Sequence, residues 1–288
     1  MNSRLAGVAL HLSALALFVA MDTLVKRLTA HYAVPQLMWA RFLFSLLGAA
    51  LVIRVATGGL PWRSRAPGLQ AARSLLLAAS NLLFSSALAR VPLADATAVG
   101  FASPVLTVAL AAAWLGEPVG WRRWAGVGIG LVGVAVALRP PFLTGGAPPD
   151  WAMALPLGTA MLFAVYQILT RKLAALDDPR TTILHTGFAA TAATSLAQPL
   201  FWTAPPFGDW PLLAGLGLLG GAGHGLLVLA FARAPASLLA PLTYTQLIWA
   251  TLAGLLVFNE WPDAASLAGA AVIALGGVLV ALPDRGRR

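Results

Sequence analysis

The chain contains no cysteine and very few charged residues. The lack of thiols excludes disulfides, thiolate nucleophiles and cysteine-ligated zinc, and it leaves the redox compartment open. Only 10% of the 288 residues are charged, against roughly 25% in soluble domains. Hydrophobic residues make up 59%, and the mean hydropathy is +0.81. This composition leaves too little polar surface for contact with water, so we expect lipid to surround most of the chain.

Catalytic motifs are missing as well. The sequence has no G-x-S-x-G elbow, no H-E-x-x-H pair and no Walker A loop, and its four histidines are scattered. Gly128-x-Gly130-x-x-Gly133 has the spacing of a dinucleotide-binding loop, but no strand precedes it, so we interpret it as a helix-packing motif. We therefore predict no enzymatic activity, no metal and no cofactor.

The net charge of +9 does not indicate a nucleic-acid partner. The Lys and Arg residues lie near the ends of apolar segments and do not form one basic face with interleaved aromatic residues. The apolar stretches are about 20 residues long and lack the alternation of a membrane β-barrel. Because backbone groups in lipid must bond within their own segment, we predict an all-α integral membrane protein with ten transmembrane helices. They are expected at residues 5–25, 35–54, 68–89, 93–115, 121–138, 151–170, 181–201, 210–232, 237–258 and 264–282, with the first helix retained and not cleaved as a signal peptide.

Part of the sequence occurs twice. Residues 87–138 match residues 230–281 without a gap at a constant shift of 143 positions, which places Glu117 on Glu260. Chance matches between apolar residues are common in such a biased composition, but Arg, Pro, Glu and Gly positions also coincide here. The agreement in one register indicates an internal duplication.

A second match joins the beginnings of the two copies. At a shift of 145, residues 17–28 lie over residues 162–173. We therefore predict two five-helix halves, residues 1–139 and 151–288. The short Pro- and Gly-rich linker at 140–150 is expected to keep them in one bundle.

The distribution of positive charge predicts the orientation. If the N-terminus is cytoplasmic, most Lys and Arg residues fall on the cytoplasmic side, and the opposite side holds Lys26, Arg27, Arg90 and Arg139. The positive-inside rule then places both termini in the cytoplasm. Since each half has an odd number of helices, the second half must enter the membrane upside down. Such inverted repeats are typical of secondary transporters, whose substrate site lies near the midplane between the repeats.

Several short motifs resemble a known family. They are AL-x-x-x-P-x-A at 87–94, Pro104 within the next helix, LGEP at 115–118 and WAGVGIGLVGVAVAL at 124–138. Together they resemble the EamA family of the drug/metabolite transporter superfamily. The resemblance implies a ten-helix transporter of two inverted five-helix repeats, and many members export amino acids or other metabolites. The second half departs from the pattern, with Leu247 in place of the proline, which predicts an asymmetric site.

Few charged residues lie inside the predicted helices. Asp22 is the acidic residue nearest the bilayer interior, and Arg41 has a similar depth in the next helix. We interpret them as a structural ion pair or as snorkelling side chains, with an outer gate or a substrate-carboxylate anchor as the alternative. Glu117 and Glu260 are expected to cap helices or to pair with nearby Arg122 or with backbone amides. Arg73 is expected to extend toward the cytoplasmic interface.

Polar and aromatic side chains are the best candidates for a central cavity. Polar groups in lipid need partners, so they should face the bundle interior, with bonding between helices as the alternative role. The candidate substrate-binding residues are Trp39, Asn81, Phe101, Tyr166, Gln167, His185, His224, Tyr244, Gln246 and Trp249. Such a lining suits a neutral or zwitterionic molecule with an apolar side chain.

We predict a secondary transporter of a bacterial-type inner membrane that exports neutral or aromatic amino acids, or related small metabolites, by alternating access. The alternative is uptake of a nucleoside-like or vitamin metabolite of the S-adenosylmethionine or riboflavin type. A membrane enzyme or lipid-handling protein would need acid/base or metal groups clustered at one interface, and a scaffold would need a sealed interior. The expected partners are a small-molecule substrate and the lipid bilayer; a monomer is compatible with the sequence.

Overall fold

The computed structural model describes residues 3–115, 121–138, 151–173, 176–231, 233 and 240–281, and these ranges contain helices and no strand. The α-helices are α1 (Ser3–Leu28), α2 (Val34–Thr57), α3 (Pro67–Leu88), α4 (Leu93–Gly100), α5 (Ala102–Leu115), α6 (Trp121–Leu138), α8 (Ala154–Leu173), α9 (Pro179–Ser195), α10 (Gln198–Phe201), α11 (Trp210–Phe231), α13 (Gln246–Ala253) and α14 (Ala264–Ala281). Short 3₁₀ segments are η1 (Trp151–Met153), η2 (Phe207–Asp209) and η3 (Ala240–Thr245), and η4 (Gly254–Phe258) is a π-helical turn. The predicted all-α class is confirmed.

Five segments have the length and composition of membrane spans. They are Leu5–Leu28, Val34–Thr57, Pro67–Leu88, Trp151–Thr170 and Phe207–Leu227. A helix rises 1.5 Å per residue, so about 20 apolar residues cross the roughly 30 Å hydrocarbon layer. Four further apolar helices are shorter: Leu93–Thr107, Trp124–Val136, Leu242–Phe258 and Ala264–Leu279. Ten transmembrane helices were predicted, and the residues that the structure describes contain five clear spans.

The helix predicted at 93–115 is interrupted. It ends at Gly100 as α4, turns at Phe101 and resumes at Ala102 as α5. Pro104 falls in the first turn of α5, where a residue without an N–H interrupts no helical hydrogen bond. The proline that the sequence places in mid-helix therefore marks the start of a new helix.

The helix predicted at 237–258 is also interrupted, and its described part consists of η3, α13 and η4. It ends at Asn259, whose φ of 54° is left-handed, a conformation that asparagine tolerates better than most residues. The shift of 143 places Phe101 on Tyr244, which lies in η3. Both copies are thus interrupted at matching positions.

The helix predicted at 181–201 is displaced and divided. It begins at Pro179, where the Asp178 side chain caps it by accepting a hydrogen bond from the Arg180 backbone N–H at 2.7 Å. It ends at Ser195 and is followed by the separate α10. Pro199 lies in the first turn of α10 and cannot donate the backbone hydrogen bond of a continuing helix.

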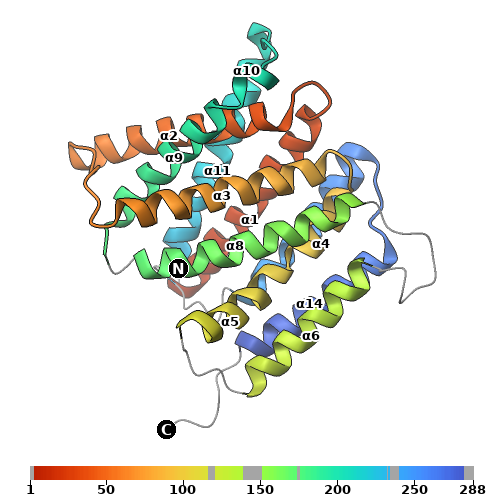
Figure 1. Ribbon diagram of the computed structural model, residues 1–288. Helices are drawn as coiled ribbons and strands as arrows, with labels where there is room; N and C mark the ends of the chain where they lie inside the picture. Colours follow the sequence, from red (N-terminus) through yellow and green to blue (C-terminus); the bar gives the residue numbers. More distant parts are fainter. Residues whose placement is uncertain are drawn as a thin grey trace.

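Helices of the first half of the chain pack on helices of the second half throughout the bundle. α1 packs on α11, α2 on α9 and α11, and α3 on α8 and α9. α6 and α14 lie side by side along one edge (Figure 1). The two halves therefore share one interior.

Glycines bring α6 and α14 into close contact. A Cβ on Gly133 would lie 2.7 Å from the Ile273 nitrogen, and one on Gly276 would lie 2.8 Å from the Gly130 nitrogen. No side chain fits at either place, so small residues set this close approach. The predicted packing role is confirmed for Gly130 and Gly133, whereas a Cβ on Gly128 would meet open space.

The largest buried apolar cluster gathers near one end of the bundle. Its members there include Leu28, Val91, Leu93, Met153 and Leu213. We call this the Lys26 end, defined by residues 26–33, 89–92, 203–209 and 259–263. The opposite end, defined by residues 58–66 and 176–178, is called the Arg63 end.

Candidate functional site

Asp22 on α1 and Arg41 on α2 bring opposite charges into the bundle. Their residues are 7% and 9% exposed, and each acts electrostatically on the other. Within the part of the chain that the structure describes, they form no salt bridge at or below 4.0 Å, and neither side chain makes a hydrogen bond. The two charges are close enough to interact electrostatically but do not form a salt bridge.

Helix α11 lies against these charges through glycines. A Cβ on Gly217 would lie 2.7 Å from the Arg41 carbonyl oxygen, and one on Gly220 would lie 3.8 Å from Arg41 Nε. One turn farther, His224 is exposed and packs edge-to-face on Phe18, with ring centroids 4.9 Å apart. His224 is within electrostatic reach of Arg41 and Arg73. The accessible His224 ring thus lies one turn from the glycines that pack against Arg41.

Arg73 on α3 does not extend toward the interface as predicted. It is 5% exposed and donates hydrogen bonds to three hydroxyl groups: Thr170 at 2.6 Å, Thr186 at 2.5 Å and Tyr166 at 2.7 Å. Its guanidinium also lies 4.5 Å from the centroid of the Tyr166 ring. Arg73 thus joins α3 to α8 and α9. The same hydrogen bonds compensate for the burial of its charge. The spacing of four places Tyr166 and Thr170 on one face of α8, but the sequence does not show that Arg73 meets this face.

The two interrupted helices meet through Phe101 and Tyr244. Their rings pack edge-to-face with centroids 5.2 Å apart. The Tyr244 hydroxyl occupies the space that a side chain at Gly277 would need. Nearby in sequence, Ser103 and Thr107 of α5 accept hydrogen bonds from Gln167 Nε2 at 3.4 and 3.2 Å. Predicted site residues from both halves therefore meet around the interruptions.

Other predicted site residues lie elsewhere. Trp39 donates to Ser195 Oγ at 3.0 Å near the Lys26 end, whereas His185 contacts the Trp62 carbonyl at 2.8 Å at the Arg63 end. Asn81 donates to the Leu77 carbonyl of its own helix at 2.9 Å. Gln246 is half-buried on α13, and Trp249 on the same helix is 41% exposed. Their binding roles stay predictions, and the structure does not bring Trp39 and His185 together.

A salt bridge joins the two halves at the Lys26 end. Lys26 Nζ lies 3.0 Å from a Glu260 carboxylate oxygen and donates to the Val91 carbonyl at 2.8 Å. Both side chains line a pocket of about 820 Å³ that also includes Arg27 and Arg90. Glu260 pairs with a lysine and not with an arginine or backbone amides as expected. Its counterpart Glu117 lies outside the described residues.

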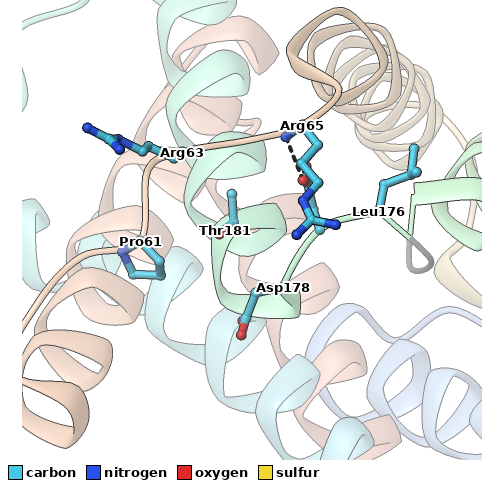
Figure 2. Close-up of a pocket in the computed structure, with 7 residues that line it drawn as sticks. Pro61, Arg63, Arg65, Leu176, Asp178 and Thr181 are labelled. Atoms are coloured by element: carbon cyan, nitrogen blue, oxygen red, sulfur yellow. Dashed lines mark hydrogen bonds between the residues drawn. The ribbon is translucent and has the colours of Figure 1, made fainter.

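A hydrogen-bonded carboxylate holds two loops together at the Arg63 end. Asp177 accepts hydrogen bonds from the Ser64 hydroxyl, from the Arg65 backbone N–H at 2.7 Å and from Gln70 Nε2 at 2.8 Å. These bonds, the one from Ser64 above all, hold the pKa of Asp177 below its ordinary value. Figure 2 shows the adjacent pocket, of about 410 Å³, between the loop before α3 and the start of α9.

Comparison with known proteins agrees with this architecture. The model of the EamA-like transporter family matches residues 5–139 and 150–282. One protein of known crystal structure aligns with a TM-score of 0.64 over 97% of this chain and 96% of its own, at 22% identity, which shows a shared fold.

Characterised relatives align over most of their length. An S-adenosylmethionine uptake transporter of Rickettsia bellii is 27% identical over 267 residues, 93% of this chain and 90% of the relative. A riboflavin transporter of Rhizobium johnstonii is 29% identical over 277 residues, 93% of this chain and 86% of the relative. Since the family model matches both halves, the chain belongs to the EamA-like transporter family and is a membrane transporter.

Proposed function

We propose that this transporter takes up a metabolite of the S-adenosylmethionine or riboflavin type. The proposal rests on the similarity to an S-adenosylmethionine uptake transporter over 93% of this chain. A riboflavin transporter is similar over the same share of the chain. The relatives therefore favour the uptake alternative over amino-acid export, which was the leading prediction from the sequence.

The geometry near the interrupted helices is compatible with a large, partly aromatic substrate. Phe101 and Tyr244 supply rings, and Gln167 supplies an amide from α8. Aromatic and amide groups suit a heteroaromatic base, which needs both stacking faces and hydrogen bonds. Asp22 and Arg41 are buried charged residues on α1 and α2, and we propose that they also line the site.

We further propose that the halves are inverted repeats that expose the site alternately. Under the shift of 143, the contact of Gly133 with Ile273 corresponds to the contact of Gly276 with Gly130. A contact that repeats with its partners exchanged is what a two-fold axis produces. The Phe101–Tyr244 contact joins two matching positions in the same way, which supports an axis between the interrupted helices.

The orientation follows from the charge distribution. We propose that both termini are cytoplasmic and that the Lys26 end faces the outside of a bacterial-type inner membrane. The apolar cluster and the Lys26–Glu260 salt bridge close this end.

Transport by the purified protein in sealed liposomes tests the function. The outer solution holds S-adenosylmethionine, riboflavin and a mixture of amino acids, and mass spectrometry identifies what enters. Selective entry of S-adenosylmethionine or riboflavin above protein-free liposomes is expected. Entry of amino acids alone would return the assignment to the amino-acid alternative.

A further inference from the structure

We infer that the site binds an α-amino-acid head group, with Arg41 holding the carboxylate and Asp22 the ammonium group. The inference rests on the proposed function and narrows it. S-adenosylmethionine carries such a head group, and riboflavin does not. The argument depends on the bonding and surroundings of these two side chains.

Arg41 has unused hydrogen-bond donors. A guanidinium carries five N–H groups, and none bonds to a described residue. The residue is only 9% exposed, so water compensates only in part for a guanidinium without a hydrogen-bond partner. A carboxylate that accepts two parallel hydrogen bonds from the guanidinium would compensate for that burial.

The charged ends of both residues remain accessible. Neither side chain forms a hydrogen bond with a described residue. Even so, no polar atom of Asp22 or Arg41 is among the fully buried atoms that lack a partner. Their polar atoms must therefore touch solvent-accessible space. A ligand of suitable size can reach them, and the Asp22 carboxylate offers only acceptors, which suits an ammonium group.

The glycines of α11 keep this place open. A side chain at Gly220 would begin 3.0 Å from Met21 Sδ and 3.8 Å from Arg41 Nε. Without it, no α11 side chain at this position covers the guanidinium. His224, one turn away and exposed, adds a ring that can hydrogen-bond to the same ligand.

The other buried arginine is a weaker candidate. Arg73 already donates to the hydroxyls of Thr170, Thr186 and Tyr166. At the Lys26 end, Lys26 is paired with Glu260. Among the buried residues that the structure describes, Asp22 and Arg41 are therefore the oppositely charged pair that best suits a zwitterion.

Two compounds that differ in one group test the inference on the unmodified protein. Decarboxylated S-adenosylmethionine keeps the adenosyl, sulfonium and amine groups and lacks the carboxylate. In sealed liposomes, uptake of S-adenosylmethionine should exceed uptake of this analogue on the order of tenfold, the effect of losing a charge-assisted hydrogen bond. Equal uptake of the two, or uptake of riboflavin alone, would overturn the inference and leave the proposed function intact. If neither S-adenosylmethionine nor riboflavin enters, the proposed function itself fails, and the inference with it.

Variants then test whether Arg41 causes the preference for the compound that carries the carboxylate. Arg41→Gln should abolish the preference for the carboxylate, and Arg41→Lys should retain part of it because the charge remains. Arg54→Gln is the matched control, since Arg54 is exposed on the same helix, and it should behave like the unmodified protein. An Arg41→Gln variant that keeps the full preference would assign the carboxylate to another residue. The comparison of the two compounds does not depend on whether a variant folds.

Discussion

Lys26 Nζ lies 3.0 Å from the Glu260 carboxylate and thereby ties the end of α1 to the segment between η4 and α14. The side chains are 10% and 31% exposed. They belong to different halves and close the same end as the buried apolar cluster. If this end opens during transport, the salt bridge must break in each cycle.

Glu260→Gln should therefore open the Lys26 end more often. A partly exposed ion pair contributes about 0.2–1 kcal/mol, so a few-fold change in the open population is expected. The natural lack of cysteine allows a direct measurement. In an Ala96→Cys background, where position 96 is fully buried near this end, a membrane-impermeant maleimide should label several-fold faster after Glu260→Gln. Arg27→Gln is the control, and equal labelling in both variants would contradict a closing role.

Gly276→Ala should destabilise the protein. The new Cβ would lie 2.6 Å from the Gly126 carbonyl oxygen and 2.8 Å from the Gly130 nitrogen, and backbone atoms cannot move aside as a side chain would. Overpacking of this kind lowers the free energy of unfolding by about 1–3 kcal/mol. Thermal unfolding in detergent measures the effect. Gly128→Ala, whose Cβ meets open space, should be near neutral, and a similar loss in both variants would remove the packing explanation.

The Asp177 hydrogen bonds predict a pH-dependent stability difference. Because the folded-state pKa is lowered, the contribution is present above the ordinary carboxyl pKa of about 3.9 and is lost as the pH falls through the lowered value. Asp177→Asn should lower the melting temperature at pH 7 and have a smaller effect near pH 3. The measurement is thermal unfolding of both proteins at the two pH values. An effect independent of pH would exclude the ionised carboxylate as its cause.

Removal of both central charges separates binding from structural support. Arg41→Ala alone leaves Asp22 without its neighbouring opposite charge, which should lower the melting temperature. The double variant Asp22→Ala/Arg41→Ala should regain part of the melting temperature and still fail to transport S-adenosylmethionine. Recovery of uptake in the double variant would show that the pair only supports the fold.

The sequence predicted the features that depend on local composition. Long apolar runs predict helices wherever lipid requires internal hydrogen bonding, and the all-α class was confirmed. Gly130 and Gly133 were interpreted as packing residues because no strand precedes them, and they lie against α5 and α14. Asp22 and Arg41, predicted to form an ion pair or to snorkel, are buried without forming a salt bridge with each other.

Features that depend on neighbouring helices were missed. Gly100 and Pro104 offered a local signal for the interruption at Phe101, but the π-helical turn of η4 has no such signal in its sequence. Arg73 was expected at the interface because it lies near the start of α3. That position gives no information about the hydroxyls of Thr170 and Thr186. Those groups come from other helices, and only the packing shows that they meet the guanidinium.

Counterflow is the most direct test of a carrier that takes up S-adenosylmethionine through one alternately exposed site. Liposomes containing the purified protein are loaded with unlabelled S-adenosylmethionine and diluted into a trace of the labelled compound. We predict a transient accumulation of label inside, above its equilibrium level, because outward movement of the unlabelled compound returns the site for labelled molecules. Uptake no greater than in protein-free liposomes, or simple equilibration without an overshoot, would contradict this account.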